Sequence, residues 1–445
     1  MKKFRLAAIA LACTSLVGAA HAVDLVAIGE LDPDAHDLSG LSAPLENGVP
    51  GDLLGGLGSA LAWAGGSTFL AAPDRGPNAV PWNPLVDDTT TYVPRFHTID
   101  LALTQVPNGN LPFTLTPTLA ATTLMFTRET LNYGPVHPND NLKHKQYFDG
   151  RSDNFDPSTG SGDAHDARLD PEGLRVSRNG RMVYVSDEYG PYVYKFDRET
   201  GARKATIPLP VTFDIASKSS QGALEISGNT SGRVANKGME GLAITPDGKM
   251  LVGFEQSPLI QDGGDGGRAN RIVTIDLATL ETHQYAYDNY LADMAKAYNS
   301  SEILALNSHE FLVLERDGKG RGDGSSAVVK RLYKIDLANA TDVSGISGEA
   351  NLLPFAVQKT LFLDIRAALD TAGIADTEIP AKIEGAAFGA DVTVDGVVKH
   401  TLYLANDNDF LPVAPGGLAN PNQWFVFTFT DDDLGGSEFV PQQFK

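Results

Sequence analysis

The sequence predicts an all-β protein, a β-propeller with five to six four-stranded blades whose ring is closed by the N-terminal strand. Three observations predict this fold. A hairpin module recurs along the 445 residues, short apolar runs alternate with turns, and the two ends of the chain complement each other. Repetition of one supersecondary unit indicates a single ring, although the length alone would allow two or three domains.

The module is clearest in the stretch DPEGLRVSRNGRMVYVSDE, from Asp170 to Glu188. Alternating apolar residues on either side of Asn179-Gly180 are typical of a β-hairpin. The same layout returns without gaps from Glu240 to Glu255, with its turn at Pro246-Asp247-Gly248. Antiparallel pairing brings the start of the first strand and the end of the second to one edge. We therefore expect the acids at both ends of each module to gather there.

Three further copies are looser, and each again ends a strand on acidic residues. Their segments are Ile383-Glu384-Gly385 with Asn406 to Asp409, a second half alone at Phe311 to Asp317, and Ser39-Gly40-Leu41 with Thr68 to Gly76. The modules together indicate five blades, and a sixth could lie within residues 104–169.

The two ends of the chain predict how the ring closes. Residues 24–31 look like a strand without a hairpin partner, whereas the last unit (383–388, 400–405 and 423–430) lacks a fourth strand. We expect the N-terminal strand to complete this last blade, which removes exposed sheet edges.

The segments between the modules are mostly irregular. Long polar insertions are expected near 74–94, 126–169 and 214–237, and loops of this length are often functional. Short helices are expected at 290–299 and 365–372.

Residues 1–22 have the layout of a signal peptide. Lys2, Lys3 and Arg5 precede an apolar stretch, and Ala20-His21-Ala22 fits the small-residue cleavage pattern. Residues 23–445 are then expected to form a single propeller domain. The one cysteine, Cys13, lies inside this segment; lipidation there is the alternative, for which Ala10-Leu11-Ala12 is a poor match. We expect an exported bacterial protein, periplasmic or extracellular, without disulfides or a membrane span.

The charge balance excludes some partners. The formal charge is −21, and removal of Lys2, Lys3 and Arg5 with the signal peptide makes it −24. Nucleic acids and anionic membrane surfaces are therefore not expected as partners. A highly phosphorylated substrate would need divalent cations, held by carboxylates, between itself and the protein. The alternative is that the acidity only keeps an exported protein soluble.

The modules also predict a candidate site. If their first strands line the axis, Glu172, Glu240 and Glu384 converge at the mouth of the central channel. The second strands bring more acids to the same rim: Asp74, Asp187, Glu188, Glu255, Glu315, Asp317, Asp407 and Asp409. Carboxylates gathered in this way raise one another's pKa or recruit hard cations such as calcium. The glycine after each glutamate allows close backbone approach.

An alternative for these glutamates is structural. They could cap strand backbones and pair with the available arginines, which are Arg75, Arg175, Arg316 and Arg321. No P-loop, Cys-x-x-Cys or Gly-x-Ser-x-Gly motif occurs, so neither an organic cofactor nor a serine triad is expected.

The motifs DPEGL with SDE, EGLAITPDG, LERD, and KIEGA with ANDND resemble the phytase-like family, described as esterase-like activity of phytase, over residues 36–430. The resemblance implies an exported propeller that hydrolyses phosphoester or ester bonds of a small molecule with calcium. The metal ligands that it implies are Glu172, Asp187, Glu188, Glu240, Glu255, Glu384 and Asp407. Catalytic roles fall to Glu172, Glu240 and Glu384, with Arg75 or Arg316 holding phosphate. The sequence departs from the expected pattern in lacking a visible lysine- or arginine-rich substrate subsite, which argues against phytate itself.

Three functions compete at this stage. The first is metal-dependent phosphoester hydrolysis, and the second is a metal-dependent lactonase, since propellers with axial carboxylates perform that chemistry. The third is a non-catalytic propeller that binds a ligand or a protein. A calcium titration combined with phosphatase and lactonase assays would separate them.

Overall fold

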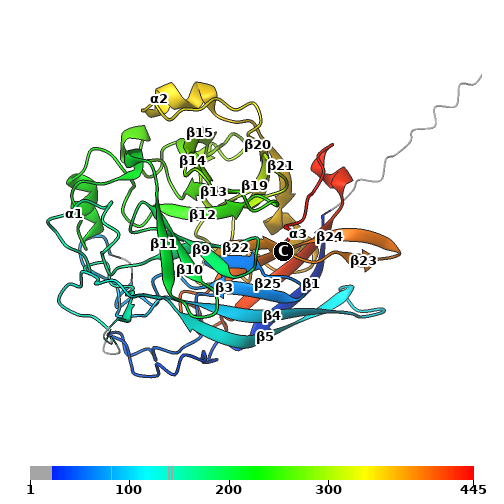
Figure 1. The fold of residues 1–445 in the computed structure, drawn as a ribbon. Coiled ribbons are helices and arrows are strands. Elements are labelled where there is room, and N and C mark those ends of the chain that lie inside the picture. The colour runs from blue at the N-terminus through cyan, green and yellow to red at the C-terminus, as the bar shows by residue number, and fades with distance from the viewer. Residues whose placement is uncertain (1–22, 82, 139–140, 142–143) are drawn as a thin grey trace, which may run out of the picture.

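A computed structural model describes residues 23–81, 83–138, 141 and 144–445; the expected signal peptide lies outside them. Within this part of the chain, five four-stranded antiparallel sheets form a propeller ring (Figure 1). The all-β prediction is therefore confirmed, with five blades.

Each blade takes its strands in chain order from the axis outward, except where the ring closes. The first blade is β2 (Ala60–Trp63), β3 (Thr68–Ala72), β4 (Arg95–Gln105) and β5 (Phe113–Leu124). The second is β8 (Pro171–Val176), β9 (Met182–Asp187), β10 (Tyr192–Asp197) and β11 (Arg203–Pro208), and the third is β12 (Met239–Ile244), β13 (Met250–Glu255), β14 (Ala269–Asp276) and β15 (Thr282–Asp288). The fourth is β18 (Asn299–Ala305), β19 (Glu310–Arg316), β20 (Lys330–Asp336) and β21 (Lys359–Asp364).

The fifth blade joins the two ends of the chain. Its strands are β22 (Lys382–Phe388), β24 (Val397–Asp407), β25 (Asn422–Phe429) and, outermost, β1 (Asp24–Leu31). β1 pairs antiparallel with β25, from Leu31 opposite Asn422 to Asp24 opposite Thr428. The predicted closure by the N-terminal strand is confirmed.

Smaller elements decorate the ring. They are the pairs β6–β7 (Phe126–Thr127, Gln146–Tyr147) and β16–β17 (Tyr290–Leu291, Lys296–Ala297), strand β23 (Val392–Val394), helices α1 (Gly222–Ser227), α2 (Glu349–Leu352) and α3 (Ile365–Thr371), and 3-10 turns at Val211–Phe213, Ile260–Asp262, Leu353–Phe355 and Asp431–Leu434. The α3 helix confirms the one expected at 365–372. The helix expected at 290–299 is wrong, because these residues form the β16–β17 pair and the start of β18.

One of the looser repeats is placed differently from the prediction, and the half module at Phe311 to Asp317 is β19, as expected. Ser39-Gly40-Leu41 lies in a loop, and the inner strand of the first blade is β2, preceded by Ser59. In the fourth blade the inner strand is β18, where Ser301 takes the place of the axial glutamate and Glu302 the place of its glycine. A sixth blade within 104–169 is wrong, since the described residues of this range form only the end of the first blade and β6–β7.

The hydrophobic core lies between neighbouring blades. Five large apolar clusters each join one blade to the next; Leu70 and Phe96 of the first blade, for example, pack with Leu174 and Val185 of the second. Burial of such side chains stabilises the fold by about 1.5–3 kcal/mol each. Neighbouring blades therefore pack face to face around the ring, and this packing fixes the inner strands relative to one another.

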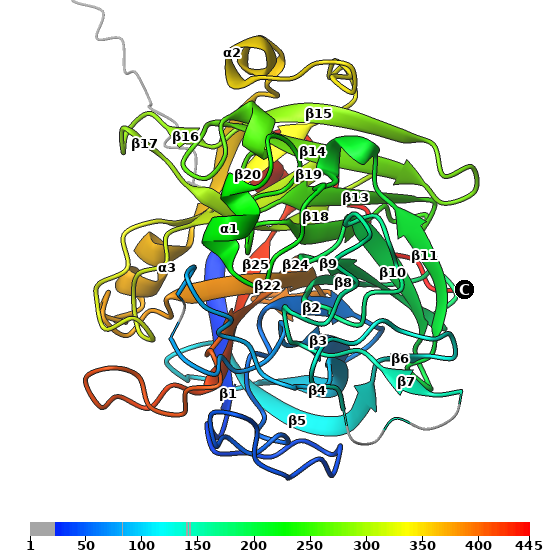
Figure 2. The ribbon, with the colours of Figure 1, turned by 90° about the vertical axis from the view of Figure 1, so that its left-hand side faces the viewer.

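The inner strands β2, β8, β12, β18 and β22 contact one another in sequence around the axis. Figure 2 looks onto the face that carries α1 and shows the labels of β2, β8, β18 and β22 around the centre. A Cβ on Gly173 would lie 2.7 Å from Leu242 Cβ, and one on Gly241 would lie 2.9 Å from the Ile303 nitrogen. Glycine after the glutamate is thus required by the close approach of neighbouring strands.

Candidate metal centre

The axial glutamates lie where the inner strands begin, at one end of the channel. Glu172, Glu240 and Glu384 each fall at a shift in register between the first and second strands of their blades. A bulge of this kind turns a side chain away from the regular alternation. All three side chains are buried, so a set of carboxylates lies in a shielded mouth.

Among the described residues, two groups of acids could hold a metal ion. One is Asp74, Asp170 and Glu172, and the other is Glu172, Glu188 and Glu240; within each group one ligand atom per residue lies within 4.8 Å of the others. Glu172 belongs to both. The donors are all carboxylate oxygens, which suits hard divalent cations such as calcium.

The other side of the mouth contains cations of the protein itself. Arg316, at the end of β19, pairs with Glu384. Lys382 pairs with Asp407 at 2.9 Å and also with Asp409. Three of the predicted residues therefore lie at the mouth but outside both groups of acids, namely Glu384, Asp407 and Asp409. Their ion pairs with Arg316 and Lys382 are the contacts expected if these acids have a structural role.

The remaining predicted residues have other partners. Asp187 accepts hydrogen bonds from the backbone nitrogens of Asp170 and Tyr189, both at 3.0 Å. Glu315 pairs with Lys359 and accepts from the Tyr287 hydroxyl, while Asp317 pairs with Lys330. Neither of these two joins the metal groups.

Glu255 lies behind the mouth. Its carboxyl is buried, and burial raises its pKa to about 8, with Arg233 opposing the shift and Glu240 adding to it. Glu255 thus lies near Glu240 but belongs to neither group of acids.

Asp170 is a site residue that the sequence analysis did not single out. Its Oδ1 accepts from the Arg75 backbone nitrogen at 2.8 Å, and its Oδ2 accepts from Arg75 Nη1 at 3.1 Å. The repeat hides this residue, because Gly238 occupies its place in the second module. Arg75 is thereby fixed at the rim next to Asp74.

The electrostatics of the mouth favour a bound cation. Burial, and then the neighbouring Glu240 and Asp170, raise the pKa of Glu172 well above its usual value. Burial and Glu384 raise the pKa of Glu240 to about 8. Glu240 Oε2 is buried and has no hydrogen-bond partner in the described part of the chain. Buried oxygens without partners are costly, so this donor set fits a hard cation.

Arg175 closes the channel below the mouth. Its Nη1 donates to the Leu61 oxygen at 2.7 Å, and its Nη2 donates to the Ile303 oxygen at 3.1 Å and pairs with Glu302 Oε2 at 2.8 Å. These partners come from the inner strands of two other blades. Arg175 therefore spans the axis of the ring.

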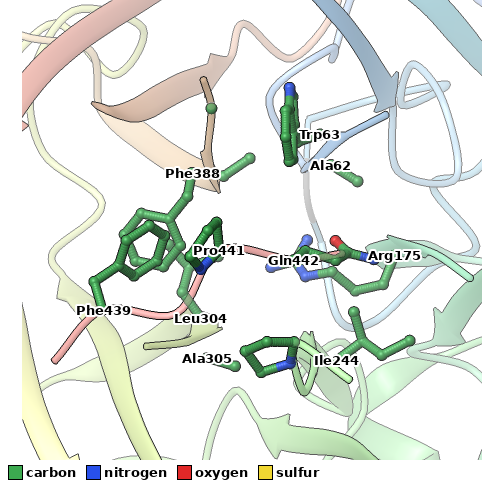
Figure 3. A pocket seen from close by; sticks show the side chains of 13 residues that line it. Ala62, Trp63, Arg175, Ile244, Leu304, Ala305, Phe388, Phe439, Pro441 and Gln442 are labelled. Carbon is green, nitrogen blue, oxygen red and sulfur yellow. The ribbon is translucent and has the colours of Figure 1, made fainter. Parts of the chain in front are cut away.

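A small cavity with a mainly apolar lining lies at the far end of the channel. The last residues of the inner strands and the C-terminal segment line it; Figure 3 shows Trp63, Ile244 and Phe388 with Phe439 and Gln442 around it. Gln442 Nε2 donates to the Val176 oxygen at 2.7 Å. This end lacks the acids of the mouth among its lining residues.

Comparisons with known proteins place the chain in context. The family model "Phytase-like: Esterase-like activity of phytase" matches residues 52–410. An uncharacterized secreted protein of Arthroderma benhamiae is 31% identical over 352 residues, and the match covers 68% of this chain and 66% of that protein, just under two thirds of its length.

The solved structures that match the chain are distant. A luciferin-regenerating enzyme is 11% identical with a TM-score of 0.33, covering 88% of this chain and 97% of its own. Hydrazine synthase of Kuenenia stuttgartiensis is 10% identical with a TM-score of 0.29, covering 80% of this chain and 78% of its own.

In the described residues, no helix has the length and apolar character needed to cross a membrane.

Proposed function

The chain belongs to the phytase-like family, and on this premise we propose that it is an exported hydrolase of phosphoester or ester bonds that requires a divalent metal such as calcium. The observation that carries the proposal is Glu172, the buried carboxylate common to both acid groups. A secreted relative supports export.

Five residues would hold the metal: Asp74, Asp170, Glu172, Glu188 and Glu240. When bound, a divalent cation supplies Lewis-acid chemistry and lowers the pKa of water. Because Glu172 belongs to both groups, it would hold the metal in either of them. Glu384 and Asp407 would act one step further out, through Arg316 and Lys382.

The residues of the chain supply orientation and proton transfer. Glu240 would offer one carboxylate oxygen to the metal, and its other oxygen is suited to accept a proton from water. Arg316 and Arg75 flank the acids on two sides and are held in place by Glu384 and Asp170. Fixed guanidinium groups stabilise negative charge that develops on an ester oxygen.

A calcium titration with a matched pair of variants tests this proposal. After chelation, added calcium should raise the melting temperature of the wild type and permit hydrolysis of an aryl phosphate or aryl ester. Glu172→Gln should weaken the calcium response by at least about 10- to 100-fold.

The control is Asp262→Asn, which removes a fully buried acid paired with Arg271 at 2.6 Å, away from the mouth. It should lower stability but keep the calcium response. A wild-type melting temperature that does not respond to calcium, together with no turnover, would leave a non-catalytic binding propeller as the better interpretation.

One observation favours a lactone as a second candidate substrate. The cations at the mouth are paired with the protein's own acids, an arrangement that admits an uncharged ester more easily than a phosphate. Opening of a lactone without release of phosphate from any phosphoester would select this candidate.

A further inference from the structure

The three long insertions enclose a second cavity beside the mouth. Residues from 74–94, 126–169 and 214–237, with Tyr189, line a small space. α1, which belongs to the third insertion, marks this face in Figure 2. We call this cavity the insertion pocket.

The insertion pocket has a chemical character opposite to that of the mouth. Its lining includes three buried arginines, Arg75, Arg168 and Arg233, against two acids, Asp88 and Glu225. Serine and threonine hydroxyls make up much of the remaining lining. Guanidinium groups and hydroxyls are the donors that recognise phosphate and carboxylate oxygens.

Two of these arginines are held rigidly. Arg168 Nη1 donates to the Ser152 backbone oxygen at 3.2 Å, and its guanidinium lies 4.7 Å from the ring centre of Phe155. Arg233 Nε donates to the Tyr189 backbone oxygen at 3.0 Å, and its Nη1 donates to Glu225 Oε1 at 2.7 Å.

Arg233 has one donor left over. Its Nη2 is buried and makes no hydrogen bond to any residue that the structure describes, although the side chain is only 4% exposed. A buried charged donor without a partner is unfavourable. The position of Arg233 in the pocket lining therefore points to a ligand oxygen as the missing acceptor.

The pocket adjoins the candidate metal centre. Arg75 lines the pocket and also binds Asp170 of the centre. Tyr189 in the lining follows Glu188 of the centre directly. An ester bound at the centre thus has a neighbouring cationic pocket within the same face of the ring.

We propose that the insertion pocket binds a second anionic group of the substrate, a phosphate or a carboxylate, beside the ester that is hydrolysed. This inference rests on the proposed function for the role of the bound group, but not for the binding itself. It supplies the arginine-rich subsite that the sequence alone did not reveal.

Inorganic phosphate is the probe, and the full mature chain in excess chelator is the protein. Calorimetric titration should detect phosphate binding without any metal, since the pocket uses arginines. Arg233→Gln should weaken this binding by about tenfold or more, the loss of a charge-assisted hydrogen bond. If that variant does not fold, Arg233→Lys, which retains the charge but not the planar fork, should also bind phosphate more weakly.

Arg271→Gln is the matched control. Arg271 is fully buried and paired with Asp262 and Gln284, but it does not line the pocket. Its replacement should reduce stability and leave phosphate affinity unchanged. Equal phosphate affinity in the wild type and both Arg233 variants, or no anion binding without metal, would overturn the proposal.

Two further arms separate the remaining questions. Comparison of phosphate with acetate shows which anion the pocket prefers, and either preference supports it if it depends on Arg233. Glu240→Gln should impair the calcium response and leave phosphate binding intact. Loss of phosphate binding in Glu240→Gln would place the anion at the metal centre and contradict the proposed pocket. Absence of turnover alone would count only against the proposed hydrolase.

Discussion

Glu172 matters most at the scale of single residues, because both groups of acids contain it. Its counterparts differ. Glu384 in the fifth blade is paired with Arg316, and the fourth blade has Ser301 in the equivalent place. The mouth is consequently asymmetric, with the candidate ligands and Arg75 on the side of the first three blades and Arg316 and Lys382 on the other.

His97 makes acid stability testable at the same scale. This residue of β4 is 1% exposed, and its Nδ1 lies 3.0 Å from Thr122 Oγ1. Burial lowers the pKa of His97 from 6.5 to about 3. Between these values the unfolded chain binds the proton and the folded chain does not, so stability increases with pH by up to about 1.4 kcal/mol per unit.

We expect His97→Gln to reduce the slope of unfolding free energy against pH between about 3 and 6.5, measured by urea unfolding. The contribution of His97 is fully present above pH 6.5 and is lost as the pH falls. Thr122→Val should lower stability while keeping the slope, because it removes the hydrogen bond but no titrating group. Identical slopes in His97→Gln and the wild type would contradict the assignment.

At the scale of elements, the inner strands depend on small residues where they meet. A Cβ on Gly173 would lie 2.7 Å from Leu242 Cβ and 2.9 Å from the Glu240 backbone oxygen. Gly173→Ala should therefore lower the free energy of unfolding by about 1–3 kcal/mol, and it should also weaken calcium binding by displacing Glu240.

The matched control is Gly345→Ala, where nothing lies within 4 Å of the added Cβ. A change within about 0.5 kcal/mol is expected there. Equal stability of the two variants would show that the contact between β8 and β12 is looser than the structure indicates.

Arg175 acts at the scale of the whole molecule, because it ties inner strands of different blades together across the axis. Arg175→Met leaves Glu302 buried without its cation, so unfolding free energy should fall by about 3–5 kcal/mol. The double variant Arg175→Met/Glu302→Gln should lose less than the sum of the single variants, since the orphaned charge is gone. Strictly additive losses in urea unfolding would argue against a direct pair.

The architecture was predictable because its signals are local. Period-two alternation and Asn-Gly or Asp-Gly turns specify each hairpin, and the unpaired strands at the two ends specify the closure that β1 and β25 make. The helix expected at 290–299 failed because these residues form the local hairpin of β16 and β17 and then begin β18, which pairs with β19.

The sequence by itself determined the propeller, its closure and the gathering of acids at one mouth, since a repeated hairpin brings its ends to the same edge. Only the tertiary structure decided which acids lie close enough together to hold a metal, which pair with Arg316 or Lys382, and that Arg168 and Arg233 line one pocket. These contacts join residues from different blades and insertions. The distances between such residues depend on how the blades pack in the ring, and the contacts leave no periodic pattern in the sequence.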